Sequence, residues 1–242
     1  MNKTALITGA SRGIGYAIAF ALAKEQYDLI LTCQKNIDLL EDLKEDLQRK
    51  YRVEVMTFCG DVSDYGFWED LKAKTEERFP TVDVVINNAG ISYVGLLSEM
   101  SIEDWHKVMN TNLTSVFYSS RLFTPAMIRQ KSGHIINISS IWGHRGASCE
   151  VAYSASKGGM NAFTKALAKE LAPSGVYVNS ISCGVTDTDM NKIFTAEERA
   201  LLEEEIPMGR FGTPKEVADA VIAILNTTYL TGQIIGVDGG FF

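Results

Sequence analysis

Seven short apolar runs, rich in residues that favour β-structure, alternate along the chain with segments of helical length. Most runs are continuous rather than alternating in polarity, which is typical of parallel strands covered on both faces. The intervening segments suit right-handed crossovers through a helix. The runs span residues 4–8, 29–33, 53–58, 82–87, 134–139, 176–182 and 233–239. This pattern predicts an α/β fold with one seven-stranded parallel sheet and helices on both faces.

The 242 residues show no repeat, low-complexity tract or linker, so we predict a single doubly wound domain. Two helix starts carry clear capping signals. Ser101 is followed by Asp104, and Thr213 is followed by Pro214 and by Glu216 at the third helical position.

Charge and composition exclude several classes of partner. The net charge of −7 argues against nucleic acid or an anionic membrane as the main partner. No apolar run is long enough to span a membrane, and the N-terminal MNKTALITGA lacks the features of a signal peptide. We therefore expect a cytoplasmic protein.

The four cysteines and three histidines show no metal-ligand spacing, so we predict no structural metal. Cys33 and Cys59 stand at expected strand ends, and we interpret both as buried apolar fillers.

A glycine-rich turn, TGASRGIG at residues 8–15, follows the first expected strand and opens into an apolar helix. Gly9, Gly13 and Gly15 permit a tight turn, and the helix N-terminus offers N–H groups to a pyrophosphate. The same glycines would also serve a plain strand-to-helix turn that needs positive φ. Their place after the first strand of a βαβ series favours a Rossmann-like dinucleotide site.

The end of the second strand favours one of the two nicotinamide dinucleotides. An acid there would bind the ribose hydroxyls of NAD, but the sequence has Cys33, Gln34 and Lys35 instead. Arg12 in the glycine turn adds a second cation, so we predict NADP(H). After the third strand, Asp61 can bind the adenine amino group or cap a helix that begins near Ser63.

Four motifs in order give the chain a family resemblance: the glycine turn, NNAG at residues 87–90, a Ser thirteen positions before Tyr-x-x-x-Lys, and TGQIIGVDGG near the C-terminus. The chain resembles the short-chain dehydrogenase/reductase family, and within it the 3-oxoacyl-[acyl-carrier-protein] reductases. The resemblance covers essentially the whole chain. It implies one NAD(P)-binding domain over residues 1–242 and a homotetramer built through helices and the last strand.

The resemblance also implies a catalytic tetrad of Asn112, Ser140, Tyr153 and Lys157. Tyr153 would donate a proton to a ketone oxygen, and Lys157, one helical turn away, would stabilise the phenolate and hold the nicotinamide ribose. Ser140 would stabilise the developing oxyanion, and Asn112 would interrupt a helix and hold a relaying water. The implied cofactor contacts are Gly9, Ser11, Arg12, Gly13, Ile14, Gly15, Lys35, Asp61, Val62, Asn88, Ala89, Gly90, Tyr153, Lys157, Gly184, Thr186 and Thr188. One departure is Cys183 in place of the family's usual Pro, which predicts a looser nicotinamide pocket.

The sequence indicates the substrate less clearly than it indicates the cofactor. Residues 187–207 read as an acidic helical lid with only Lys192 and Arg199 as cations, a poor surface for an acidic acyl carrier protein. Lys131 matches one docking cation of the reductase subgroup, whereas Ser174 replaces the other.

A second resemblance competes with the first. SSIWG, GASCEV and AKELAPSG look like a bacterial branch that reduces a 5-aminopentanone group on elongation factor P. Glu150 would pair with the amine, so the candidate substrate residues are Ser140, Glu150 and Tyr153. A non-catalytic dinucleotide sensor is the alternative of another class.

Overall fold

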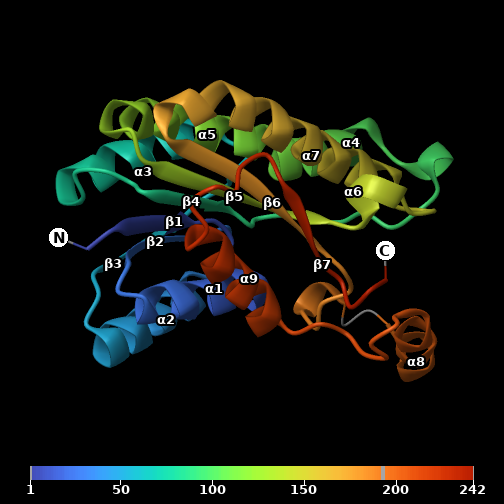
Figure 1. The fold of residues 1–242 in the computed structure, drawn as a ribbon. Coiled ribbons are helices and arrows are strands. Elements are labelled where there is room, and N and C mark those ends of the chain that lie inside the picture. The colour runs from blue at the N-terminus through green and yellow to red at the C-terminus, as the bar shows by residue number, and fades with distance from the viewer. Residues whose placement is uncertain (1, 192–193, 242) are drawn as a thin grey trace.

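A twisted sheet of seven parallel strands runs through the middle of the protein, with helices above and below it (Figure 1). The structure is a computed structural model that describes residues 2–191 and 194–241. The spatial order is β3-β2-β1-β4-β5-β6-β7, and every pairing is parallel. The strands are β1 (Thr4–Ile7), β2 (Asp28–Cys33), β3 (Val55–Cys59), β4 (Val84–Asn87), β5 (Gly133–Ser140), β6 (Val176–Cys183) and β7 (Ile234–Val237). The predicted fold class is confirmed, and each expected run overlaps one strand, with ends that differ by up to two residues.

The helices form two layers, one on each face of the sheet (Figure 1). One layer holds α1 (Gly13–Lys24), α2 (Ile37–Tyr51) and α9 (Pro214–Leu225). The other holds α3 (Tyr65–Arg78), α4 (Ile102–Met109), α5 (Ser115–Gln130) and α7 (Val151–Leu171). The short α6 (Trp142–Arg145) and α8 (Ala196–Glu205) lie near the carboxyl edge of the sheet. Each layer buries its own hydrophobic core, which includes Leu22 of α1 on one face and Trp68 of α3 on the other.

Both predicted capping signals are confirmed. The Ser101 hydroxyl accepts a hydrogen bond from the Asp104 N–H at 3.0 Å, and Thr213 with Glu216 forms a reciprocal capping box. The expected helix start near Ser63 is wrong by two residues. The helix α3 begins at Tyr65, because the Asp64 side chain caps it by accepting from the N–H of Gly66.

The two cysteines at strand ends have different environments. Cys33 and Cys59 are register partners on β2 and β3. Cys33 is buried as expected, but Cys59 is exposed, so that prediction is wrong for Cys59. The reason is position, because Cys59 is the last residue of the strand that forms one edge of the sheet.

The strand order reverses between β1 and β4, which are neighbours in the sheet. Their connections leave toward opposite layers, because α1 covers one face and α5 the other (Figure 1). In doubly wound sheets a ligand crevice forms outside the carboxyl ends of the strands at this point. The fold therefore places the glycine turn after β1 beside the NNAG run after β4.

Two kinds of feature are missing from the part of the chain that the structure describes. It contains no helix with the length and apolar character that crossing a membrane requires. It also brings together no group of three or more His, Cys, Asp or Glu side chains that could hold a metal ion.

Candidate active site

The glycine turn joins β1 to α1 and leaves the helix N-terminus open to a ligand. Gly9 and Gly13 have φ angles of +65° and +58°, which side-chain-bearing residues rarely adopt. Arg12 is the N-cap residue and makes no side-chain capping bond, and the first turn of α1 has no acid. A Cβ on Gly15 would lie 2.4 Å from the carbonyl oxygen of Gly9, so no side chain fits there. Free N–H groups and the helix dipole thus suit a pyrophosphate.

A pair of polar residues, Thr8 and Asn88, holds this turn in place. The Asn88 side-chain amide donates to the carbonyl oxygens of Thr8 and Gly9, at 2.9 and 3.0 Å. The Thr8 hydroxyl in turn accepts from the backbone N–H groups of Asn88 and Ala89, both at 3.0 Å. The sequence predicted Asn88 as a cofactor contact, whereas in the structure its side chain braces the turn. The role of Thr8 was not foreseen.

The expected adenosine end lies where the turn meets β2. The Ala10 N–H donates to the Thr32 carbonyl oxygen at 2.9 Å, which fixes the turn beside the end of that strand. Lys35 and Gln34 are exposed there, and the Gln34 amide donates to the Asp61 carboxylate at 2.7 Å.

The Asp61 carboxylate, at this edge of the crevice, already accepts hydrogen bonds within the protein. One carboxylate oxygen accepts from both the N–H and the hydroxyl of Ser63, each at 2.8 Å. Burial alone would raise the pKa of Asp61, but the hydrogen bonds from Ser63 and Gln34 lower it. Asp61 is therefore ionised at neutral pH. The next residue, Val62, is buried in the core beside Trp68, whose indole N–H donates to the Val62 carbonyl oxygen.

Asn112 lies in a π-helical turn, Asn110–Thr114, between α4 and α5, so the expected helix interruption is present. Its side chain is fully buried and has three partners. It accepts from the Ile91 N–H and donates to the Ile91 carbonyl oxygen, both at 2.9 Å, and it donates to the Ser156 hydroxyl at 3.0 Å. Such turns are common at functional sites. This one ties the loop after β4 to α7.

Gly90, Asn112 and Lys157 converge from three elements. A Cβ on Gly90 would lie 3.4 Å from the Asn112 amide oxygen and 3.6 Å from Lys157 Nζ. Lys157 is buried, and its ammonium donates to the Ile138 carbonyl oxygen at 2.7 Å. Burial lowers the pKa of Lys157 to about 8, and nearby Cys183 opposes that change. The lysine is still mainly cationic at pH 7.

Tyr153 stands one helical turn before Lys157, with Lys157 Nζ 5.7 Å from the centre of its ring. Burial raises the pKa of Tyr153 well above its ordinary value near 10, while a hydrogen bond from the Ser140 hydroxyl opposes the rise. Ser140 is itself held, because its hydroxyl accepts from the Trp142 N–H at 3.2 Å. Tyr153 is therefore a protonated phenol at neutral pH, hydrogen-bonded to the predicted oxyanion residue. The stabilisation of its phenolate by Lys157 stays a prediction.

A buried polar chain behind the site was not foreseen from the sequence. It runs from the Ser119 hydroxyl to Asn87, then to Asn137 and to the Thr164 hydroxyl, with bonds of 2.7, 2.8 and 2.8 Å. These residues belong to α5, β4, β5 and α7, so the chain fixes α7 against the sheet. The only sequence signal is an Asn inside each of two apolar strand runs.

Gly158 and Gly159 allow α7 to pack closely against its neighbours. A Cβ on Gly158 would lie 3.3 Å from the Gly143 carbonyl oxygen, and one on Gly159 would lie 2.8 Å from the Leu113 side chain.

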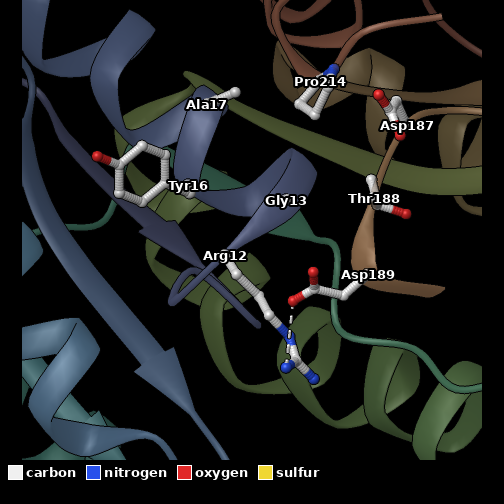
Figure 2. A pocket seen from close by; sticks show the side chains of 8 residues that line it. All are labelled: Arg12, Gly13, Tyr16, Ala17, Asp187, Thr188, Asp189 and Pro214. Atoms are coloured by element: carbon white, nitrogen blue, oxygen red, sulfur yellow. Dashed lines mark ion pairs between the residues drawn. The ribbon is translucent and has the colours of Figure 1, made fainter. Parts of the chain in front are cut away.

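The segment after β6 closes the crevice on the other side of the glycine turn. A Cβ on Gly184 would lie 2.7 Å from Asp238 Cα, and Thr186 is buried and bridges to Gly212. The Thr188 methyl lies 3.5 Å from where a Cβ on Gly13 would be. A cleft of about 360 Å³ remains between the start of α1 and residues 187–189 (Figure 2). These contacts place Thr188 directly against the expected pyrophosphate site.

Glu150 lies on the expected substrate side, at the N-cap position of α7. The Ser92 hydroxyl donates to its carboxylate at 2.6 Å, and the preceding Cys149 has a φ of +62°. The charge of Glu150 is among the causes that raise the pKa of Tyr153. The carboxylate is therefore close enough to influence the expected proton donor.

The lid segment begins in the wall of the cleft, at residues 187–189, whereas the expected docking residues lie just before β5 and β6. A Cβ on Gly175 would be 2.6 Å from the Lys131 carbonyl oxygen, so the backbones at Lys131 and Ser174–Gly175 are neighbours. The lid segment contains α8, where Arg199 pairs with Asp187 at 3.1 Å and Glu203 at 3.0 Å. Lys192 lies outside the described residues.

The glycine turn lies at the switch point of a parallel sheet, and a Tyr–Lys pair and a Ser lie at the same edge of that sheet. This combination is typical of a dinucleotide-dependent oxidoreductase. The family model described as short chain dehydrogenase matches residues 3–199, and the chain belongs to that family. It is an oxidoreductase that acts on a hydroxyl or ketone group with a nicotinamide dinucleotide.

Three relatives align over essentially their full length. The chain is 41% identical to the uncharacterized oxidoreductase YmfI of Bacillus subtilis, covering 100% of this chain and 99% of that protein. It is 37% identical to the 3-oxoacyl-[acyl-carrier-protein] reductase FabG of Aquifex aeolicus, covering 100% and 98%. It is 38% identical to the FabG of Staphylococcus epidermidis, covering 100% of both chains.

Proposed function

We propose that this protein reduces a ketone with NADPH and that Tyr153 donates the proton. The observation that carries the proposal is the placement of Tyr153, with the Nζ of buried Lys157 5.7 Å from the centre of its ring and with Ser140 at the end of β5. A reductase needs a proton to give, and this arrangement holds one at the crevice.

The residues present fit a dinucleotide. Gly13 lines the cleft, Gly90 has no side chain to fill the space beside Asn112 and Lys157, and the open start of α1 suits a pyrophosphate. Gly9, Gly13 and Thr188 would hold the diphosphate, Lys157 the nicotinamide ribose, and Gly184 with Thr186 the carboxamide. When bound, NADPH supplies the hydride for the ketone carbon.

This chain's own residues handle the oxygen. The Ser140 hydroxyl would donate to the ketone oxygen and stabilise negative charge as it develops. The Tyr153 hydroxyl would then transfer its proton to that oxygen. The phenolate left behind is stabilised by Lys157, and Asn112 would hold the water that returns a proton through Lys157.

The preference for NADP(H) over NAD(H) rests on charge at the adenosine end. No acid follows β2, where Cys33, Gln34 and Lys35 stand, and Lys35 and Arg12 are exposed at this end of the crevice. A 2′-phosphate would therefore meet two cations and no acid from β2, while the Asp61 carboxylate after β3 is already hydrogen-bonded to Ser63 and Gln34.

The first candidate substrate is a 3-oxoacyl thioester on acyl carrier protein, which would give the protein a place in fatty acid biosynthesis. Two relatives at 37% and 38% identity carry the name of that activity. Lys131 offers a cation on the surface that would face the carrier, although Ser174, its backbone neighbour, lacks a charge.

The second candidate is a cationic ketone on a protein, such as the 5-aminopentanone group of elongation factor P. One specific observation favours it: Glu150 is the N-cap residue of α7, three residues before Tyr153, and Ser92 holds its carboxylate through a hydrogen bond of 2.6 Å. A substrate amine near that carboxylate would gain a charge-assisted contact. The acidic face of α8 suits a cationic partner better than an acidic carrier.

One experiment separates the two candidates. A 3-oxoacyl thioester and an amino-ketone are assayed side by side with wild type, Glu150→Gln and Lys131→Glu. Loss on the amino-ketone only in Glu150→Gln supports the protein-linked substrate, and loss on the thioester only in Lys131→Glu supports the carrier-linked one. If neither substitution matters, both substrate proposals fail. If no ketone consumes NADPH, the protein is a dinucleotide sensor.

We also propose that the protein is a cytoplasmic homotetramer. The outward side of α5 exposes Phe117 and Ile128, and that of α7 exposes Ala162 and Ala166. Both helices lie in the outer layer on the same face of the sheet (Figure 1), where two-fold packing would cover them. Light scattering should give roughly four times the chain mass, and a stable monomer would refute the assembly.

A further inference from the structure

An ion pair crosses the cleft between the glycine turn and the segment after β6 (Figure 2). The Arg12 guanidinium lies 3.4 Å from the Asp189 carboxylate. Arg12 is the N-cap residue of α1, and Asp189 opens the short helix η4 (Asp189–Asn191). The pair thus joins two walls of the same cleft, which Gly13 and Thr188 also line.

Arg12 has a second expected partner, the 2′-phosphate of the cofactor. Its turn is hydrogen-bonded to the end of β2 through Ala10 and Thr32, and Lys35 follows that strand. Arg12 therefore belongs to the turn that meets the strand end, where the 2′-phosphate is expected, while its guanidinium pairs with Asp189. Turning toward one of these anionic groups takes the guanidinium away from the other.

The backbone around Asp189 is held in a position from which its carboxylate can compete with the 2′-phosphate for Arg12. Thr188, its neighbour, rests against Gly13, and the Asn191 side chain donates to the Thr186 carbonyl oxygen at 2.7 Å. The side chains of Arg12 and Asp189 are nevertheless 61% and 40% exposed, so their pairing is weak. A dianionic phosphate can displace the carboxylate, but only by giving up that interaction.

We propose that Asp189 is a determinant of cofactor selectivity, because it competes with the 2′-phosphate for Arg12. The proposal deepens the NADP(H) preference argued above and rests on it. It assigns Asp189 a moderating effect: the carboxylate lowers the advantage that NADPH has over NADH. Removing the charge should sharpen the discrimination between the two cofactors.

The test measures the dissociation constants of NADPH and NADH by calorimetry, without a ketone. In Asp189→Asn, the ratio of NADH to NADPH dissociation constants should rise by about two- to fivefold, the range of an exposed ion pair. Asp187→Asn is the matched control, since it removes the same charge from the same wall. Asp187 pairs with Arg199 instead, so this control should leave the ratio unchanged.

A double-mutant cycle shows whether the effect passes through Arg12. In the Arg12→Met background, Asp189→Asn should no longer change the ratio. The proposal is overturned if Asp189→Asn leaves the ratio unchanged, if Asp187→Asn raises it equally, or if the rise persists without Arg12.

This test is independent of the proposed reaction. The proposed function concerns the wild-type preference and ketone turnover, whereas the inference concerns the change in a binding ratio on substitution. A wild type that binds NADPH but reduces no ketone would refute the reaction and leave the Asp189 test intact. A wild type that prefers NADH would refute the cofactor assignment, and the substitution would still be expected to move the ratio.

Discussion

The catalytic side of the crevice and its charged rim are built on different principles. Asn112, Lys157 and Ser140 are 0%, 4% and 7% exposed, and each has hydrogen-bond partners in the protein. The charged rim, formed by Arg12, Lys35 and Asp189, is exposed. The ion pair between Arg12 and Asp189 is therefore accessible to solvent. Buried polar groups must be satisfied and are costly to disturb, whereas exposed pairs contribute little. The difference suggests that the buried side fixes the reaction and the rim adjusts which cofactor and substrate take part.

The largest effect is expected at Tyr153. Tyr153→Phe keeps the ring and removes the proton, so kcat should fall by about 10²–10⁴-fold while the dissociation constant of NADPH stays within about twofold. Steady-state assays and calorimetry provide the two numbers. Turnover close to wild type would mean that another group protonates the ketone oxygen.

Lys157→Ala should damage two properties at once. Because Lys157 is expected both to stabilise the phenolate and to hold the ribose, kcat should fall by about 10²-fold or more and NADPH should bind about tenfold more weakly. Lys165→Ala, an exposed lysine on the same helix, is the control and should leave both unchanged. Normal NADPH affinity in Lys157→Ala would refute the dual role.

At the rim, wild type should prefer NADPH to NADH by at least about tenfold in kcat/KM, which is about 1.4 kcal/mol. Lys35→Glu should invert this preference, because an acid at the strand end repels the 2′-phosphate and can bind the ribose hydroxyls. Equal efficiency of wild type with the two cofactors would contradict the account of the rim.

Thr8 and Asn88, which hold the glycine turn in place, act through hydrogen bonds inside the protein, as the catalytic residues do, although they contact no reacting atom. Asn88→Ala leaves the Thr8 and Gly9 carbonyl groups without their donor, so the free energy of unfolding should fall by about 1–3 kcal/mol. Asn226→Ala, at an exposed helix end, should have little effect in the same urea titration. No difference between the two variants would show that the brace is dispensable.

A further effect concerns pH and the cofactor-free protein. The pKa of Lys157 is about 8 when folded, against an ordinary 10.5, so between these values the unfolded chain binds more protons. Wild type should therefore gain stability relative to Lys157→Met as the pH rises from 8 to about 10, and the gap should be constant below pH 8. Denaturant titrations at pH 7, 8 and 10 measure this, and a gap independent of pH would contradict the shifted pKa.

Patterns within one element were enough to predict the fold. The seven strands follow from continuous apolar runs, and the turn at Gly9–Gly15 follows from glycine spacing, because both depend on neighbouring residues. The tetrad positions came from the family resemblance, and the structure brings Asn112, Ser140, Tyr153 and Lys157 to one edge of the sheet.

The sequence did not predict which side chain bonds to which across the sheet. Asn88 was expected to contact the cofactor, which stays a prediction, but the bond from its side chain to Gly9, 79 residues away in sequence, was not foreseen. The pairing of Arg12 with Asp189 joins residues that are far apart in the sequence. Such contacts depend on how strands and loops are placed in space, which local spacing does not determine.

The central claim is that the crevice performs hydride transfer and does more than bind a dinucleotide. The most direct measurement uses NADPH carrying deuterium at the transferable position of the nicotinamide, together with a small 3-oxo ester, and locates the label by mass spectrometry and NMR. The account predicts one deuterium on the carbinol carbon of the alcohol for each NADPH oxidised. NADPH that binds but stays unoxidised with every ketone offered, or an alcohol without the label, would contradict it.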